Sequence, residues 1–190
     1  MKTALKILAV LVASIALGLF ATWFTVVRGE MPGGVSDGPW TTNLLTGSSG
    51  GSMYVRAAVA LHGLLALNRS ETIYYGAQTD SDGAALDGAC TYLIAGRDPP
   101  ARWWSITVYG SDDFLIANPG KRYSISKTSV MRDASGIFTA TVAPHANGAN
   151  ALPTNGQAFN LTLRLYNPAA TVAADPAHVA LPSIKKVSCS

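Results

Sequence analysis

The stretches WWSITVY (Trp103–Tyr109) and FNLTLRLY (Phe159–Tyr166) predict β-strands more clearly than any other part of this sequence. In both, apolar side chains alternate with more polar ones. A period of two is the pattern of a strand with one buried face and one wetter face. The apolar positions of this pattern are Trp104, Ile106, Val108, Phe159, Leu161, Leu163 and Leu165.

The composition extends this prediction to the rest of the folded part. The chain has 190 residues, and its 18 glycines and 10 prolines fall between short apolar runs. Such spacing favours many short strands joined by turns, as in a sandwich or a jelly roll. We therefore expect a mainly β, jelly-roll-like β-sandwich with one packed helix, preceded by an N-terminal transmembrane helix.

Three segments follow from the order of these features. We expect a transmembrane anchor over residues 1–28, a Gly/Pro-rich linker over 29–52 and the sandwich over 53–190. The sandwich begins with a helix from Met53 to about Leu67, which Ser52 can cap. His62 stands alone on that helix and is interpreted as a surface or packed residue. Residues 144–156 are expected to form a long loop.

The anchor is an uncharged run of 21 residues, Ile7–Val27. A helix needs about 20 such residues to cross the hydrocarbon core of a membrane. Lys2 and Lys6 precede it, so we expect the N-terminus in the cytoplasm and the domain in the periplasm or another extracytoplasmic space. The alternative is a signal peptide cleaved near Ala16, but the apolar run continues to Val27, which is unsuited to a mature N-terminus.

Charge excludes one class of partner. The net charge is +3, and the basic residues are scattered, with no basic stripe or nucleic-acid motif. We therefore expect no nucleic-acid partner.

The two cysteines agree with export. Cys90 and Cys189 are far apart in sequence and lack metal-ligand spacing, and in an oxidising compartment they can form a disulfide. The alternative is two unpaired thiols.

A series of short motifs resembles one known family, the one called domain of unknown function 1214, over about residues 53 to 187. The resemblance implies a jelly-roll-like domain, which in larger relatives follows a domain of unknown function 1254. We expect the anchor to stand in place of that domain here, and Ala151 stands where the family usually has Trp. The family has no settled activity to transfer. The motifs are Tyr74-Tyr75, Asp80-x-Asp82-Gly83, Leu86-Asp87-Gly88, Tyr92, Trp104-Ser105-x-Thr107-x-Tyr109, Asn118, Arg122-Tyr123-Ser124-Ile125, Asn150-x-Leu152-Pro153, 159–168 and Leu181-Pro182-x-Ile184.

The first candidate site is a group of aspartates, Asp80, Asp82 and Asp87. Loops supply oxygen ligands to calcium from alternating positions, as Asp80 and Asp82 do here, but the length and the Glu of an EF-hand are missing. Asp and Gly are also ordinary residues of β-turns, and we favour that interpretation. We assign no metal and no cofactor.

The second candidate site is the polar face of the two clear strands. If these strands are neighbours, their polar side chains share one surface, where aromatic rings beside an arginine suit a sugar, a carboxylate or an aromatic ligand. The alternative is the solvent-exposed outer face of a sandwich, with Arg164 covering apolar surface. The residues concerned are Trp103, Thr107, Tyr109, Asn160, Arg164 and Tyr166, joined on the family pattern alone by Arg122 and Tyr123.

These features lead to two hypotheses about function. No Ser-His-Asp spacing, nucleophile elbow or phosphate-binding loop is present. We therefore expect a non-enzymatic protein of the bacterial cell envelope, held by a signal anchor, that binds a partner protein or a ligand as an accessory subunit of a membrane complex. The alternative is an enzyme, or an enzyme subunit, acting on a saccharide or other polar small molecule through an Asp/Arg/Tyr site.

Overall fold

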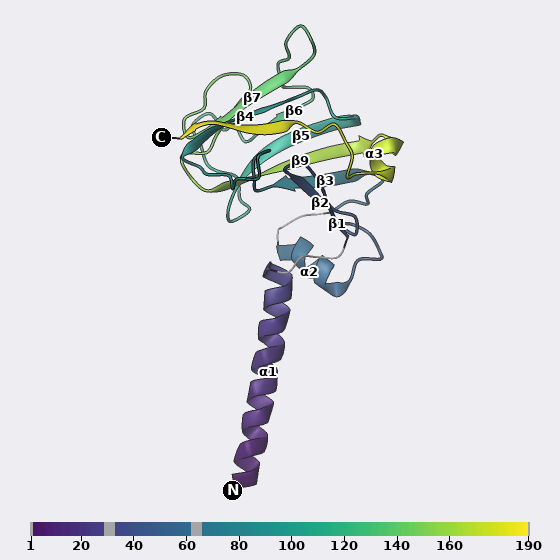
Figure 1. The fold of residues 1–190 in the computed structure, drawn as a ribbon, viewed down its shortest axis with the longest axis vertical. Coiled ribbons are helices and arrows are strands. Elements are labelled where there is room, and N and C mark those ends of the chain that lie inside the picture. Colours follow the sequence, from purple (N-terminus) through teal and green to yellow (C-terminus); the bar gives the residue numbers. More distant parts are fainter. Residues whose placement is uncertain (1, 29–32, 62–65, 190) are drawn as a thin grey trace.

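The computed structural model describes residues 2–28, 33–61 and 66–189. A long helix, α1 (Lys2–Arg28), extends from a domain of two β-sheets (Figure 1). The six-stranded sheet has the order β1-β2-β3-β9-β5-β6, and the four-stranded sheet has the order β10-β4-β7-β8. Their bounds are β1 (Gly34–Asp37), β2 (Trp40–Asn43), β3 (Thr72–Ala77), β4 (Cys90–Gly96), β5 (Ala101–Gly110), β6 (Ser124–Ser126), β7 (Phe138–Ala143), β8 (Ala151–Pro153), β9 (Phe159–Pro168) and β10 (Ser183–Cys189). The predicted mainly β fold with two sheets and few helices is confirmed.

The two clear strands of the sequence, β5 and β9, are neighbours in the middle of the six-stranded sheet. They pair antiparallel, with Trp104 opposite Leu165 and Ile106 opposite Leu163. These four side chains are buried. The alternation seen in the sequence therefore marks the face that the sheet turns toward the core.

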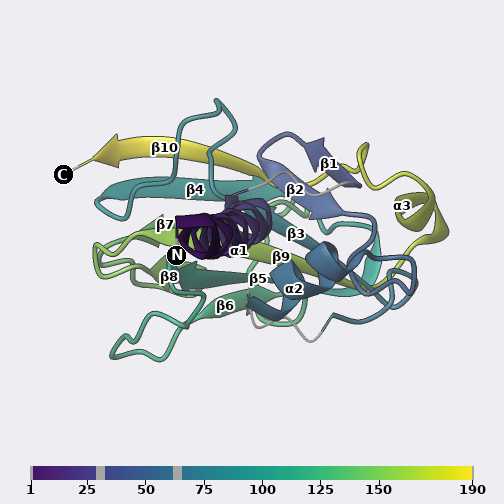
Figure 2. The ribbon, with the colours of Figure 1, turned by 90° about the horizontal axis from the view of Figure 1, so that it is seen from below.

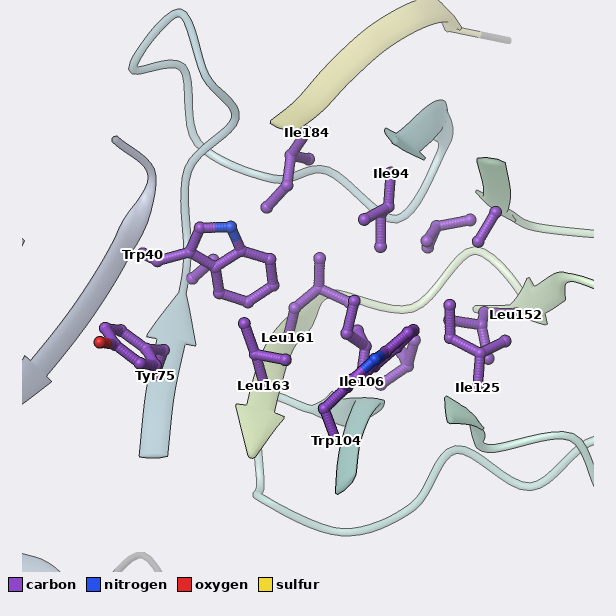
Figure 3. Close-up of a cluster of buried hydrophobic side chains, with 14 of the residues drawn as sticks. Trp40, Tyr75, Ile94, Trp104, Ile106, Ile125, Leu152, Leu161, Leu163 and Ile184 are labelled. Carbon is purple, nitrogen blue, oxygen red and sulfur yellow. The ribbon is translucent and has the colours of Figure 1, made fainter. Parts of the chain in front are cut away.

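The core lies between the two sheets. Trp104 of β5 stacks on Phe138 of β7, with ring centroids 4.9 Å apart, so this pair joins the layers. Ile94 and Ile184 approach from the four-stranded sheet, and Leu161 approaches from the other (Figure 3). Burial of large apolar side chains from both sheets stabilises the sandwich.

The segment expected to be a linker differs from that expectation, because residues 34–43 form β1 and β2 and extend the six-stranded sheet. The cause is Trp40, which is fully buried and donates its indole N–H to the carbonyl oxygen of Pro182 at 2.7 Å. Burial of a tryptophan with a satisfied N–H outweighs the turn-forming composition around it.

The leading helix is shorter than expected over the described residues. It is α2 (Met53–Leu61), and Ser52 accepts the backbone N–H of Val55, as a capping residue does. His62 and the rest of 62–65 lie outside the described residues, while Leu67 is not helical. Besides β1 and β2, two further elements were not predicted, β8 within the expected loop at 144–156 and the short helix α3 (Ala170–Ala174).

Helix α1 is long and apolar enough to cross a membrane over Lys2–Val27. Its side chains are exposed along nearly its whole length, so the domain does not cover it. It projects from the base of the domain, where α2 lies between α1 and the six-stranded sheet (Figure 1). Seen from below, α1 is viewed end-on in front of that sheet (Figure 2).

Cys90 and Cys189 form a disulfide, as the sequence allowed. The bond joins opposite positions of β4 and β10, the two strands at one edge of the four-stranded sheet. It closes a separation of 99 residues and ties the C-terminal strand to the domain.

Candidate functional site

The polar positions of β5 and β9 do share one surface, the outer face of the six-stranded sheet. Tyr109 lies opposite Asn160, Thr107 opposite Thr162 and Ser105 opposite Arg164. Opposite residues of an antiparallel pair project from the same face. On the other side of β9, Tyr74 of β3 lies opposite Arg164 and completes the row.

Arg164 is the centre of this face. One of its terminal nitrogens donates to the hydroxyl of Tyr109 at 2.9 Å, and the other donates to Oγ1 of Thr107 at 3.3 Å. Its guanidinium carbon lies 5.4 Å from the ring centroid of Tyr109 and 6.0 Å from that of Tyr74. Within the described part of the chain, no carboxylate forms an ion pair with Arg164. Two aromatic rings and two hydroxyls therefore hold a half-buried positive charge in place.

A groove of about 660 Å³ runs along the outer face beside Arg164. Its floor is formed by β3, β5 and β9, and its sides by the end of α2, the start of β2 and the turn after β5. A volume of this size falls in the range of small-molecule sites, which is about 300–1,000 Å³. Its lining residues are Pro39, Thr41, Leu61, Gly76, Ala77, Gln78, Thr79, Tyr109, Asp112, Asp113, Phe114, Asn160, Leu161, Thr162 and Arg164.

The turn after β5 supplies residues that the sequence interpretation missed. Asp112 accepts the backbone N–H of Phe114 at 3.1 Å, and Asp113 accepts the side-chain amide of Asn160 at 3.5 Å. Asp113 has φ of 62°, the left-handed region that only a few non-glycine residues adopt. Among the described residues, the groove thus carries one cationic group on its floor and two carboxylates in its wall. The sequence feature that could have identified these residues is the pair of aspartates directly after a strand with a polar face.

The aspartates singled out from the sequence are not among the residues that line the groove. Asp80 is buried, and its Oδ1 accepts the backbone N–H groups of Asp82 and Ala84 at 3.0 and 2.9 Å. Asp87 is exposed and accepts the N–H of Ala89. These contacts are those of aspartates that fix turns.

The remaining candidate residues lie apart from the groove. Trp103 and Tyr166 form a ring pair with centroids 5.2 Å apart, further along the same face. Arg122 donates to the backbone carbonyls of Gly148 and Ala149, so it fastens the loop before β8. Neither the ring pair nor Arg122 lines the groove.

Metal ligation has no donor set in the part of the chain that the structure describes. There, no group of three or more His, Cys, Asp or Glu side chains is placed to hold an ion. His178 contacts Asp175 at 3.0 Å, and that pair is exposed.

The comparisons with known proteins give the family and the fold. The chain matches the family described as Protein of unknown function (DUF1214) over residues 71–170, more than half of its length. The chain belongs to this family. No curated protein matches it.

Two solved structures are similar. The VPA0106 protein of Vibrio parahaemolyticus shares 22% sequence identity with a TM-score of 0.64, over 91% of this chain and 43% of that one. An uncharacterised protein from Burkholderia cenocepacia shares 14% identity with a TM-score of 0.41, over 63% of this chain and 30% of that one. The first likeness shows the fold alone, and this chain spans less than half of that protein's length.

Proposed function

We propose that this protein is an exported, membrane-anchored binding module that holds a small polar ligand in the groove beside Arg164. The observation that carries the proposal is the arrangement of Arg164, whose guanidinium is fixed by Tyr109 and Thr107 on the floor of a groove. A fixed cation loses little side-chain entropy when a ligand binds, so the site is suited to recognition.

The same proposal places the domain outside the cytoplasm. Lys2 and Lys6 precede the apolar run, which favours a cytoplasmic N-terminus for α1. A disulfide persists in oxidising compartments such as the periplasm, and Cys90–Cys189 supports that location.

The charges of the groove define the ligand class. The guanidinium of Arg164 offers a donor fork that matches a carboxylate or a phosphate. Asp112 and Asp113 in the wall attract the opposite charge and would repel a simple polyanion. The groove therefore suits a small zwitterion, with its anionic group on Arg164 and an ammonium near the two aspartates.

Isothermal titration of the full chain in detergent micelles tests this assignment. The probe is phosphoethanolamine, compared with ethyl phosphate, which lacks the ammonium, and with ethanolamine, which lacks the anion. We expect phosphoethanolamine to bind most tightly. Equal affinities for phosphoethanolamine and ethyl phosphate would show that the aspartates do not contribute to binding. The absence of any heat of binding with phosphoethanolamine and ethyl phosphate would count against the groove as a ligand site.

The matched variants are Arg164→Gln and Arg102→Gln. Both remove one guanidinium from the chain, but Arg102 is exposed and does not line the groove. A hydrogen bond to a charged group contributes about 1.5–3 kcal/mol, so Arg164→Gln should weaken binding about tenfold or more. Arg102→Gln should leave the affinity unchanged.

One observation favours an enzyme as the second candidate. Two carboxylates line the same groove as Arg164 and Tyr109, and paired carboxylates can perform general acid–base chemistry. A ligand altered during incubation with the wild type and unaltered with Asp112→Asn or Asp113→Asn would favour this candidate. A ligand recovered intact from the wild type would favour the binding module.

A further inference from the structure

Helix α2 is apolar on both of its faces, although only one of them is covered. Val55 is buried, and Val59 joins it in lining the cavity that α2 forms with β2 and β3. These two residues are four apart and share one face. The face of α2 that is turned toward the sheet therefore already lies against the domain.

The opposite face of α2 consists of apolar residues open to the surroundings. Met53 is 84% exposed, Leu61 is 64% exposed and Tyr54 is 43% exposed. At 100° per residue they lie on the side of the helix away from Val55, together with Ala57 and Ala60, which are also exposed. A helix that carries apolar residues on two opposite faces belongs in an environment that covers both of them.

The position of α2 indicates what covers this face. It lies at the base of the domain, between the six-stranded sheet and α1, and its residues approach those of α1 (Figures 1 and 2). A bilayer crossed by α1 would end close to α2. The charge of α2 agrees, because its sequence contains Arg56 and no acidic residue. Basic and apolar residues without acids are typical of helices that lie in a membrane interface.

The groove extends the same surface. Leu61 at the end of α2 and Phe114 in the turn after β5 both line it, and Phe114 is 74% exposed. Apolar side chains therefore stand on two sides of the groove that holds Arg164. A protein in water rarely leaves such a set uncovered unless the set is a contact surface.

We infer that the outer face of α2, with Met53, Tyr54 and Leu61, docks into the interface of the same membrane that α1 crosses. This inference rests on the proposed anchor role of α1. Docking holds the domain with the outer face of its six-stranded sheet toward the bilayer. The groove beside Arg164 then opens next to the lipid headgroups.

Fluorescence quenching of the full chain in nanodiscs tests the docking. Leu61→Cys and Thr139→Cys are each labelled with an environment-sensitive fluorophore, in discs prepared at one chain per disc and containing lipids with a quencher just below the headgroup. Thr139 is exposed on β7, in the other sheet, and is the matched control. We expect quenching several-fold stronger at position 61 than at position 139.

A second set of variants tests whether the quenching depends on the outer face of α2 itself. Met53→Glu with Tyr54→Glu, carrying the label at position 61, should lose most of the quenching, while Arg56→Gln should keep most of it. Equal quenching at positions 61 and 139, or quenching that the two glutamates do not change, would overturn the inference. Strong quenching that requires two chains per disc would also overturn it, in favour of a second copy.

The anchor itself has a separate readout. Flotation of the full chain with liposomes reports whether α1 inserts, and this does not depend on α2. Flotation with no preferential quenching at position 61 refutes the docking and leaves the anchor intact. Loss of flotation in the wild type refutes the anchor.

Discussion

The two outer faces of the sandwich differ far more than its two inner faces. Inside, both sheets present large apolar side chains to one shared core. Outside, the middle of the four-stranded sheet shows a row of Lys185, Leu93 and Thr141. The corresponding row of the six-stranded sheet holds Arg164 against aromatic rings, and Tyr74 of that row also lines the cavity that α2 forms with β2 and β3. Both sheets thus contribute to the core that stabilises the fold, whereas the candidate chemistry belongs to one outer face.

The largest expected effect separates the inner face from the outer face on one strand. Trp104 is fully buried and stacks on Phe138, so Trp104→Ala should lower the free energy of unfolding by about 3–5 kcal/mol. Trp103 is half-buried on the outer face, and Trp103→Ala should cost about 1 kcal/mol. Urea unfolding of the full chain in detergent measures both. Equal losses would contradict the assignment of the two faces.

The disulfide in the four-stranded sheet tests whether that sheet affects stability without affecting the groove. Replacing Cys90 and Cys189 by Ala should lower the free energy of unfolding by about 2–5 kcal/mol, because a long loop of the unfolded chain is released. Phosphoethanolamine affinity should stay at the wild-type value below the unfolding transition, since the bond joins β4 to β10, away from the groove. A loss of affinity in folded protein would show that the two faces are coupled.

The next prediction concerns the aspartates that the sequence singled out. Asp80→Ala removes a buried carboxylate that accepts two backbone N–H groups and should cost about 2 kcal/mol of stability. Asp82→Ala changes an exposed side chain and should stay within about 0.5 kcal/mol of the wild type. Thermal unfolding without calcium compares the stability of the two variants with that of the wild type, and thermal unfolding with calcium tests whether the turn binds the ion. Calcium stabilisation that disappears in Asp82→Ala would contradict the turn assignment.

The smallest effect is a pH dependence on the inner face. Burial raises the pKa of the Tyr75 phenol well above its usual value of about 10, with added effects from Asp37 and Asp175. The folded state then keeps a proton that the unfolded state releases. Stability is fully present below pH about 10 and falls above it, by up to about 1.4 kcal/mol per pH unit. Tyr75→Phe should flatten this fall. The free energy of unfolding is measured by urea unfolding at several pH values between about 9 and 11. The same decrease with pH in the wild type and in Tyr75→Phe would contradict the assignment.

The two central strands of the six-stranded sheet were predictable because their side chains alternate over seven residues or more. The alternation in 103–109 and 159–166 marks which side chains point into the core, so it predicted both β5 and β9 and the face that each turns inward. Strand β2 has four residues, and its burial depends on the contact between Trp40 and the distant Pro182. No local pattern records a contact of that kind.

The candidate site was predictable only in part, for the same reason. Arg164 and Tyr109 could be proposed as neighbours from two periodic strands. Asp112 and Asp113 belong to a turn, and Leu61 to a helix, and only the tertiary fold brings them to one groove. The motif Asp80-x-Asp82-Gly83 stood out in the sequence because turns that are fixed by a buried aspartate share their residues with metal-binding loops.

A backbone amide titration by NMR tests the central claim most directly. The full chain, isotopically labelled and in detergent micelles, is titrated with phosphoethanolamine, and shifts are compared between the two sheets. We expect saturable shifts at Arg164, Tyr109 and Asp113, all at or beside the groove, and none along β4, β7 and β10. Shifts spread over both sheets, or confined to the four-stranded sheet, would contradict the claim that one outer face carries the function.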